Sequence, residues 1–227
     1  MTLSIIMPVL DEAAGIEAAL AALAPFRARG VEVIVADGGS QDATAALAHP
    51  LADYVIATAR GRAAQMNAGA AAARGDIYLF LHVDTQLPPD ADRLVVDGIA
   101  HSGQDWGRFD VRFDGGGLLA LVALTMNLRS RITGIATGDQ AAFVTRAAFE
   151  RAGGFPAIAL MEDVALSVKL KRIGRPLALR VRVTTSARRW RRHGVLRTIL
   201  LMWKLRLRYF LGADPAKLAR AYGYGGR

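Results

Sequence analysis

Four carboxylate side chains follow short apolar runs in the first half of the chain. Asp11 and Glu12 come after the first run, Asp37 ends the second, and Asp84 follows a third. If these runs are neighbouring parallel strands, their carboxyl ends share one edge of a sheet, where open α/β sheets bind ligands. Each acid alone could be a helix cap or a turn residue. Acids at three strand ends together favour a binding site.

The stretch YLFLHVDTQLPPD, residues 78–90, carries an imidazole and a carboxylate two residues apart, His82 and Asp84. The chain has neither a Gly-x-Gly-x-x-Gly fingerprint nor a Walker sequence, so phosphate binding here would need another positive group. The simplest is a divalent cation, because Mg²⁺ usually takes one or two carboxylates together with substrate phosphates. Asp84 is the best metal-ligand candidate.

The elements that would position these acids alternate between strands and helices. We predict strands over residues 3–9, 31–36, 53–58 and 76–82 and helices over 12–23, 42–48 and 62–73. This alternation favours βα units, a mostly parallel sheet and right-handed crossovers. Gly75 is expected to close the helix over 62–73 in a left-handed conformation.

The second half of the chain is less regular. Weak alternation of apolar and polar residues predicts an edge strand over 105–113. The other expected elements are strands over 140–145 and 177–185 and helices over 118–132, 146–154 and 162–173. We find no internal repeat and no linker, and 227 residues suffice for one α/β domain with a sizeable core.

Composition narrows the class of protein. The chain has no cysteine, which leaves no disulfide or thiolate metal site and fits a reducing compartment. The first apolar run is too short for a signal peptide, and no run approaches the roughly 18 apolar residues of a spanning helix. The net charge is +9, and residues 164–213 contain fourteen Lys or Arg and no Asp or Glu. This asymmetry indicates anionic partners: phosphates, a nucleic acid or an acidic membrane surface.

The stretch GVLRTILLMWKLRLRYFLG, residues 194–212, predicts a basic amphipathic helix whose long apolar side chains share one face. That face could pack on the domain, dock on a membrane surface or form a dimer contact. A last short helix is expected over residues 214–223, and the tail 224–227 is expected to fray.

Four stretches together resemble a known family. SIIMPVLDE, VIVADGGSQDAT, GRAAQMNAGAAAARGDIYLFLHVDT and MEDVALSVKLKRIGR occur in the order typical of family 2 glycosyltransferases of the GT-A fold, over residues 2–190. The variant FLHVDT, with GDQAAF and SARRW, most resembles the group called radical-SAM/selenodomain-associated transferase 2, which is linked to arsenosugar biosynthesis. The resemblance implies a Rossmann-like, mostly parallel central sheet flanked by helices.

The resemblance also implies a nucleotide-sugar site at the strand ends. Asp11 and Asp37 match residues that contact the uracil or ribose, and Arg62 should lie near the base or phosphates, with Asn67 behind it. Asp84 matches the second acid of the Asp-x-Asp motif and should hold Mn²⁺ or Mg²⁺ on the diphosphate. The remaining nucleotide-sugar candidates lie beside these residues: Pro8, Glu12, His82 and Val83.

Asp163 matches the general base of the inverting enzymes, and Glu162 is a supporting residue. From the sequence alone, either acid could instead favour a helix dipole at a helix N-terminus. Candidates on the acceptor or diphosphate side are Asp139, Gln140, Arg189 and Trp190, of which the last two resemble the end of a Gln-x-x-Arg-Trp motif.

The sequence departs from the family pattern in two places. His82 stands where the family usually has its first Asp. It could still bind the ribose or help to ligate the metal, but it removes one negative charge from the cation site. Ser186 replaces the Gln of Gln-x-x-Arg-Trp. Because that motif marks polymer-making members, we expect transfer of a single sugar.

We therefore expect a GT-A domain over residues 1–190, with a nucleotide-sugar half (1–90) and an acceptor half (91–190). A C-terminal amphipathic extension over 191–227 should pack on it. The expected reaction is inverting, metal-dependent transfer from a nucleotide-diphosphate sugar, most simply UDP-linked, to a small-molecule or lipid-linked acceptor.

The expected location is the cytoplasm, with peripheral contact at the inner face of an acidic membrane left open, and the sequence does not predict an oligomeric state. The alternative is a membrane-surface or nucleic-acid-binding protein on a degenerate transferase fold. Nucleic acid is not the expected partner, because the strand-end acids repel its phosphates and no nucleic-acid-binding motif is present.

Overall fold

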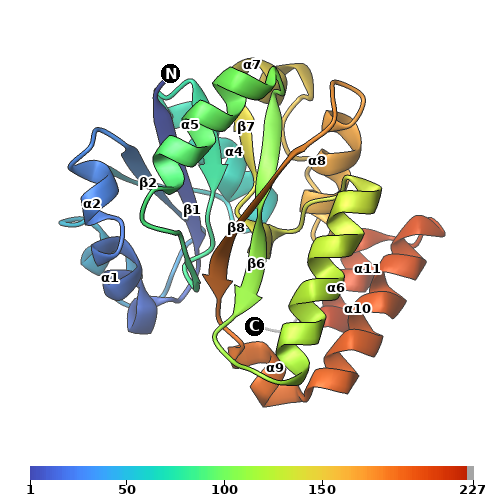
Figure 1. The fold of residues 1–227 in the computed structure, drawn as a ribbon. Helices are drawn as coiled ribbons and strands as arrows, with labels where there is room; N and C mark the ends of the chain where they lie inside the picture. The colour runs from blue at the N-terminus through green and yellow to red at the C-terminus, as the bar shows by residue number, and fades with distance from the viewer. Residues whose placement is uncertain (224–227) are drawn as a thin grey trace.

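One sheet with helices on both faces organises the chain (Figure 1). The computed structural model describes residues 1–223, so the predicted tail over 224–227 lies outside the described residues. In the described part the strands are β1 (Leu3–Val9), β2 (Glu32–Asp37), β3 (Tyr54–Ala57), β4 (Ile77–Phe80), β5 (Thr85–Gln86), β6 (Trp106–Phe113), β7 (Phe143–Thr145) and β8 (Leu177–Thr185).

The helices connect and cover these strands, and a short 3-10 turn, η1, spans Gly138–Gln140. The helices are α1 (Ala13–Ala21), α2 (Ala24–Arg27), α3 (Thr44–Ala48), α4 (Arg62–Ala72), α5 (Ala91–Ser102), α6 (Leu118–Thr133), α7 (Arg146–Arg151), α8 (Glu162–Leu170), α9 (Arg188–His193), α10 (Val195–Phe210) and α11 (Pro215–Tyr222).

The first four strands confirm the predicted βα units. The sheet order is β3-β2-β1-β4-β7-β6-β8-β5, and β3, β2, β1 and β4 are parallel neighbours. Their carboxyl ends therefore lie along one edge. The later strands are mixed, because β7 is antiparallel to both β4 and β6, while β6 is parallel to β8.

The central strands are buried on both faces, which explains why they are continuous apolar runs rather than alternating ones. Ile5 and Val33 lie in the core cluster on one face of the sheet. Their neighbours in sequence, Ile6 and Ile34, lie in the cluster on the other face, together with Phe80.

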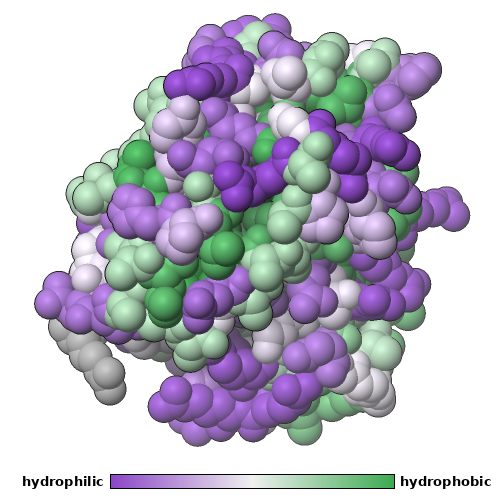
Figure 2. Space-filling model, turned by 90° about the vertical axis from the view of Figure 1, so that its left-hand side faces the viewer, coloured by the Kyte–Doolittle hydropathy of each residue, from purple (hydrophilic) through white to green (hydrophobic). Residues whose placement is uncertain are grey.

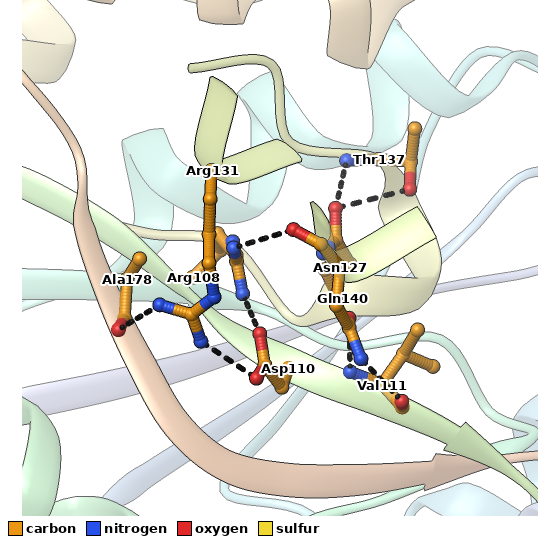
Figure 3. Close-up of polar contacts among 8 residues, drawn as sticks. All are labelled: Arg108, Asp110, Val111, Asn127, Arg131, Thr137, Gln140 and Ala178. Atoms are coloured by element: carbon orange, nitrogen blue, oxygen red, sulfur yellow. Dashed lines mark hydrogen bonds and ion pairs between the residues drawn. The ribbon is translucent and has the colours of Figure 1, made fainter. Parts of the chain in front are cut away.

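The prediction of an edge strand at residues 105–113 is wrong. β6 lies between β7 and β8, and two of its charged residues, Arg108 and Asp110, are buried. Arg108, which is 1% exposed, pairs with Asp110, and Arg131 of α6 donates to the other oxygen of Asp110 at 2.6 Å (Figure 3). This ion network compensates the buried charges, so a strand that looks half-exposed in sequence can cross the sheet interior.

The predicted left-handed cap at Gly75 is also wrong. Gly75 is not among the residues with positive φ, and α4 ends at Ala72 with Ala73 in an extended conformation. The position needs glycine for another reason: a Cβ there would lie 2.5 Å from Ser4 Oγ. Close approach of two backbones, rather than helix capping, explains this residue.

The C-terminal helices pack on the rest of the chain. Leu205 of α10 and Leu218 of α11 are buried against Ile135 and Val164. The side of α10 that carries Val195 and Ile199 packs in a cluster with α6. Within residues 1–223, no helix has the length and apolar character to cross a membrane.

Candidate functional site

The strand ends bring two predicted acids into one turn. Asp37, which ends β2, is buried and accepts hydrogen bonds from the hydroxyl and the backbone N–H of Ser40. Asp11 (φ 53°) accepts from the backbone N–H of Gln41 at 2.8 Å. Both acids thus shape the loop after β2, at the edge where such sheets bind ligands.

A buried glutamine, which sequence analysis missed, joins the same two strand ends. Gln65 Nε2 donates to the carbonyls of Val9 (2.6 Å) and Ala36 (2.9 Å). A Cβ on Gly38 would lie 3.0 Å from the Gln65 amide. A sequence signal for Gln65 is its position about one helical turn after Arg62, the residue that is expected near the base or phosphates.

Glu12 lies between Asp84 and helix α9. Arg188 Nη2 is 3.7 Å from Glu12 Oε2. Burial raises the pKa of the Glu12 carboxyl, and the negative charge of Asp84 adds to this, although the charge of Arg188 counteracts it. Asp84 is exposed, and its carbonyl accepts from the backbone N–H of Ser186 at 3.0 Å. The loop after β4 is thereby fastened to the segment that leads into α9.

Arg62 is the first residue of α4 and acts on carboxylates from both halves of the chain. Its positive charge works to lower the pKa values of Glu12, Asp139 and Glu162. A guanidinium in this place suits an anionic ligand that lies between these groups, such as a diphosphate.

His82 faces the acceptor-side turn η1. Its Nδ1 lies 3.7 Å from Asp139 Oδ1, and the Asp139 side chain is 42% exposed. Burial acts to raise the pKa of the Asp139 carboxyl, but His82, Arg62 and Arg206 outweigh it and hold that pKa below its usual range. The structure therefore joins the imidazole to a carboxylate far away in sequence.

Asp163 is held in a fixed orientation by two backbone groups. The N–H of Gly138 donates to Asp163 Oδ2 at 2.9 Å, and the N–H of Val164 donates to Oδ1 at 2.7 Å. The residue thus lies in the first turn of α8, as the helix-dipole interpretation expects. Each carboxylate oxygen retains a lone pair for a proton or a ligand.

The carboxyl group of Glu162, next to Asp163 in sequence, has a strongly raised pKa. The residue is 5% exposed, and burial together with the negative charge of Asp163 raises its pKa to about 7. Both acids line a small pocket of about 30 Å³ with His82 and Gly138. Glu162 can therefore hold or release a proton near neutral pH, as a group that supports acid–base chemistry must.

Other predicted residues have visible structural roles, and their contact with a nucleotide or an acceptor stays a prediction. Asn67 exchanges two hydrogen bonds of 2.9 Å with the backbone of Phe155. Gln140 Oε1 accepts from the N–H and hydroxyl of Thr137, which caps η1 (Figure 3). Pro8 lies within β1, and Val83 is half-buried against the core.

The two predicted α9 residues, Arg189 and Trp190, make their hydrogen bond and ring contacts with other parts of the fold and not with the strand-end acids. Arg189 Nη2 donates to the carbonyl of Tyr222 at 3.0 Å, and its guanidinium lies 3.7 Å from the Tyr222 ring centroid. Trp190 packs edge-on against Phe113 with 5.3 Å between ring centroids. Arg188, which sequence analysis did not single out, is the α9 residue that reaches the strand-end acids.

The acids at the strand ends suit a cation that is bound partly by the oxygens of a ligand. They suit less well a cation that is held by protein side chains alone. Among residues 1–223, no group of three or more His, Asp or Glu side chains is arranged to hold a metal. Mg²⁺ and similar ions commonly take one or two carboxylates and complete their shell with phosphate oxygens and water. Asp84 is exposed at the strand ends and suits that arrangement, and its charge lies close enough to Glu12 to help raise the pKa of that carboxyl group.

Comparison with known proteins identifies the family. The model of the family described as "Glycosyl transferase family 2" matches residues 4–149, more than half of the chain. The chain belongs to this family. No curated protein gives a significant match.

Solved structures show the same fold. TarS from S. aureus superimposes with a TM-score of 0.66 at 18% identity, over 82% of this chain and 61% of that chain. Glucosyl-3-phosphoglycerate synthase from Mycobacterium tuberculosis, in complex with Mn²⁺, UDP and phosphoglyceric acid, gives 0.60 at 22% identity, over 81% and 69%. That TarS structure holds residues 1–349, so the chain spans about three fifths of this fragment, and it covers 37% of a longer TarS structure. The predicted GT-A fold is confirmed.

Proposed function

We propose that this chain is an inverting glycosyltransferase that transfers one sugar from a UDP-linked donor to an acceptor hydroxyl. The observation that carries the proposal is that Asp84 and Arg62 both act on the carboxyl group of Glu12 at the strand ends, while Arg62 also acts on Glu162, the neighbour of Asp163 in sequence. Family membership supports it, and so do relatives of this fold solved with UDP-GlcNAc and with UDP and Mn²⁺.

The residues divide into a donor side and an acceptor side. Asp11 and Asp37 would bind the base or ribose, and Arg62 and Arg188 would bind the diphosphate. Positive groups placed where the leaving diphosphate gains charge are commonly worth about 3–4 kcal/mol each. We assign the donor side to residues 1–90 and the acceptor side to residues 91–190, with the C-terminal helices as an extension.

Asp163 would accept the proton of the attacking hydroxyl. The hydrogen bonds from Gly138 and Val164 fix the direction of its carboxylate, so a remaining lone pair can face the acceptor. A positioned base typically contributes about 10²- to 10⁴-fold. Attack on the face opposite the leaving diphosphate inverts the anomeric carbon.

Asp84 would hold Mn²⁺ or Mg²⁺, with His82 as a further ligand candidate. When bound, such a cation neutralises charge that develops on the leaving diphosphate. The assignment to the radical-SAM-associated group, the cytoplasmic location and a small or lipid-linked acceptor remain part of the proposal.

The first experiment is calorimetric titration of UDP, with GDP as comparator, with and without Mn²⁺. We expect Mn²⁺-dependent binding of UDP that Asp84→Asn greatly weakens. The matched control is Asp90→Asn, another exposed aspartate, which lies between β5 and α5 and should bind like the wild type. Failure of both nucleotides to bind, with and without metal, would contradict the proposed donor site.

A further inference from the structure

Two neighbouring helices expose apolar side chains that a folded protein normally buries. On α6, Leu121 is 55% exposed and Ile132 is 75% exposed, with Leu118, Leu124 and Leu128 between 45% and 61%. On α10 and the residue after it, the exposed side chains are Leu196, Leu200, Trp203, Leu207, Phe210 and Leu211, each between 61% and 76%.

Each set forms a stripe along its helix. The spacings of three and four residues place the side chains of each set on one side of the helix. The opposite sides are occupied, because Val122 of α6 and Ile199 of α10 pack in one cluster that joins the two helices. Figure 1 shows α6 and α10 together on the right-hand side of the molecule. We call the two stripes and their basic flanks the α6–α10 face.

All charged residues on this part of the chain are positive. Arg197, Lys204 and Arg208 are exposed and recur at spacings of seven and four, which places them in a row beside the α10 stripe. Arg191 and Arg192 of the preceding helix α9 are also exposed. Neither α6 nor the segment from α9 to the end of α10 contains an Asp or Glu.

We propose that the α6–α10 face docks on the surface of a membrane that contains anionic lipids. Long apolar side chains on one side of a helix and Lys or Arg beside them are the features of helices that lie in a membrane interface. The apolar stripes would enter the headgroup and acyl boundary, while the basic row would bind lipid phosphates.

A second copy of this chain fits the face less well. A two-fold symmetric dimer brings the same surface together with itself, so the basic rows would meet each other without an acidic partner. Like charges held close across an interface oppose association. An anionic surface supplies the complementary charge that this face lacks.

Docking would also place the acceptor side of the site near the lipid. The helix that carries the α10 stripe also approaches the acceptor-side acids. Burial raises the pKa of Tyr209 and the negative charge of Asp163 adds to this, while Arg206 adds to the effect of His82 in lowering the pKa of Asp139. The docking itself does not depend on the proposed transfer reaction, so the two proposals can fail separately.

The test is flotation of the purified protein with vesicles of phosphatidylcholine, alone or mixed with phosphatidylglycerol. We expect binding to the mixed vesicles that falls at high salt, and a blue shift of Trp203 fluorescence on binding. Trp106 is buried and Trp190 is half-buried, so Trp203→Phe should remove most of the shift while binding persists.

Charge-matched variants separate the face from general effects. Leu200→Glu with Leu207→Glu, and Leu121→Glu with Leu128→Glu, should each bind at least tenfold less. The control is Ala18→Glu with Ala21→Glu, two exposed positions on α1, on a face where hydrophilic and apolar residues are interspersed (Figure 2). All of these positions are exposed, so melting temperatures should change little.

Three outcomes would overturn the proposal. One is wild-type protein that does not float with anionic vesicles. Another is equal loss of binding in the α1 control and in both stripe variants. The third is a dimer, seen by sedimentation equilibrium, that the Leu200→Glu with Leu207→Glu variant dissociates, which would make the face a contact between copies of this chain.

Discussion

The imidazole of His82 lies directly against Gly138, and a Cβ on Gly138 would be 2.3 Å from His82 Cε1. The two residues come from distant parts of the chain, at the end of β4 and in the turn η1. The same glycine donates its backbone N–H to Asp163. One small residue therefore sets the spacing between the variant first position of the Asp-x-Asp motif and the proposed base.

Substituting Gly138 should damage the site more than the fold. In Gly138→Ala the new methyl group must push the imidazole aside, because real Cβ contacts are not this short. His82 would then move away from Asp139, and the hydrogen bond to Asp163 would distort. We expect a 10- to 100-fold lower kcat, which corresponds to about 1.4–3 kcal/mol. Steady-state kinetics with a UDP-sugar would measure it.

The control combines Gly138→Ala with His82→Ala, which makes room for the methyl group. The double variant should regain the melting temperature of the His82→Ala single variant. Activity should stay low, since the imidazole is lost. If Gly138→Ala alone is fully active, the contact has no role in the site.

The pKa of Glu162 predicts how stability depends on pH. Its value of about 7 in the folded protein lies above the 4.5 of an ordinary Glu. Between these values the folded state binds more protons than the unfolded state, so the free energy of unfolding falls as pH rises from about 4.5 to 7. The full cost, roughly 3 kcal/mol, is present above pH 7.

Glu162→Gln should remove this cost. We expect the variant to unfold at higher urea concentration than wild type at pH 8, with a difference that shrinks toward pH 5. Glu17→Gln, at an exposed position on α1, serves as the control and should leave the pH profile unchanged. A Glu162→Gln profile parallel to that of the wild type would show that Glu162 ionises normally.

Much of the donor side could be predicted from sequence, because it depends on local pattern. The apolar runs that become β1, β2 and β4 each end at an acid, and parallel neighbours must share an edge. Asp11, Asp37 and Asp84 could therefore be assigned to one edge before any contact was known.

The contacts between the two halves of the chain could not be predicted in this way. The approach of His82 to Asp139, and of Arg188 to Glu12, depends on how the mixed part of the sheet closes against the parallel part. The buried pair Arg108 and Asp110 makes β6 look like an edge strand in sequence for the same reason, since the ion pair of Asp110 with Arg131 of α6 is invisible in a local pattern.

Gln65 should stabilise the strand ends. Its side-chain amide donates to the carbonyls of Val9 and Ala36. Gln65→Met keeps a similar side-chain volume but removes this donor from both carbonyls. The carbonyl of Val9 still accepts from the backbone N–H of Gly38, so it loses one hydrogen bond but is not left unsatisfied. A lost hydrogen bond costs about 0.5–1.5 kcal/mol, and an unsatisfied buried polar group costs about 1–3 kcal/mol. We expect a loss of about 2–4 kcal/mol in the free energy of unfolding, measured by urea denaturation. Ala64→Met, at the half-buried neighbouring position, is the control, and equal losses would argue against a specific role for the amide.

Arg188 and Arg189 are adjacent in α9 but should differ in effect. Arg188 is exposed and lies near Glu12, so Arg188→Ala should change stability by less than about 0.5 kcal/mol. If Arg188 binds the diphosphate, the Kd for UDP should rise about tenfold, which corresponds to about 1.4 kcal/mol.

Arg189→Ala is the matched comparison. It loses the hydrogen bond and the ring contact with Tyr222, so it should lower stability by about 1 kcal/mol and leave UDP affinity unchanged. Calorimetry with UDP and thermal unfolding of both variants would measure the two effects. If Arg189→Ala weakens UDP binding and Arg188→Ala does not, then Arg189, the residue that the sequence motif indicated, binds the diphosphate instead of Arg188.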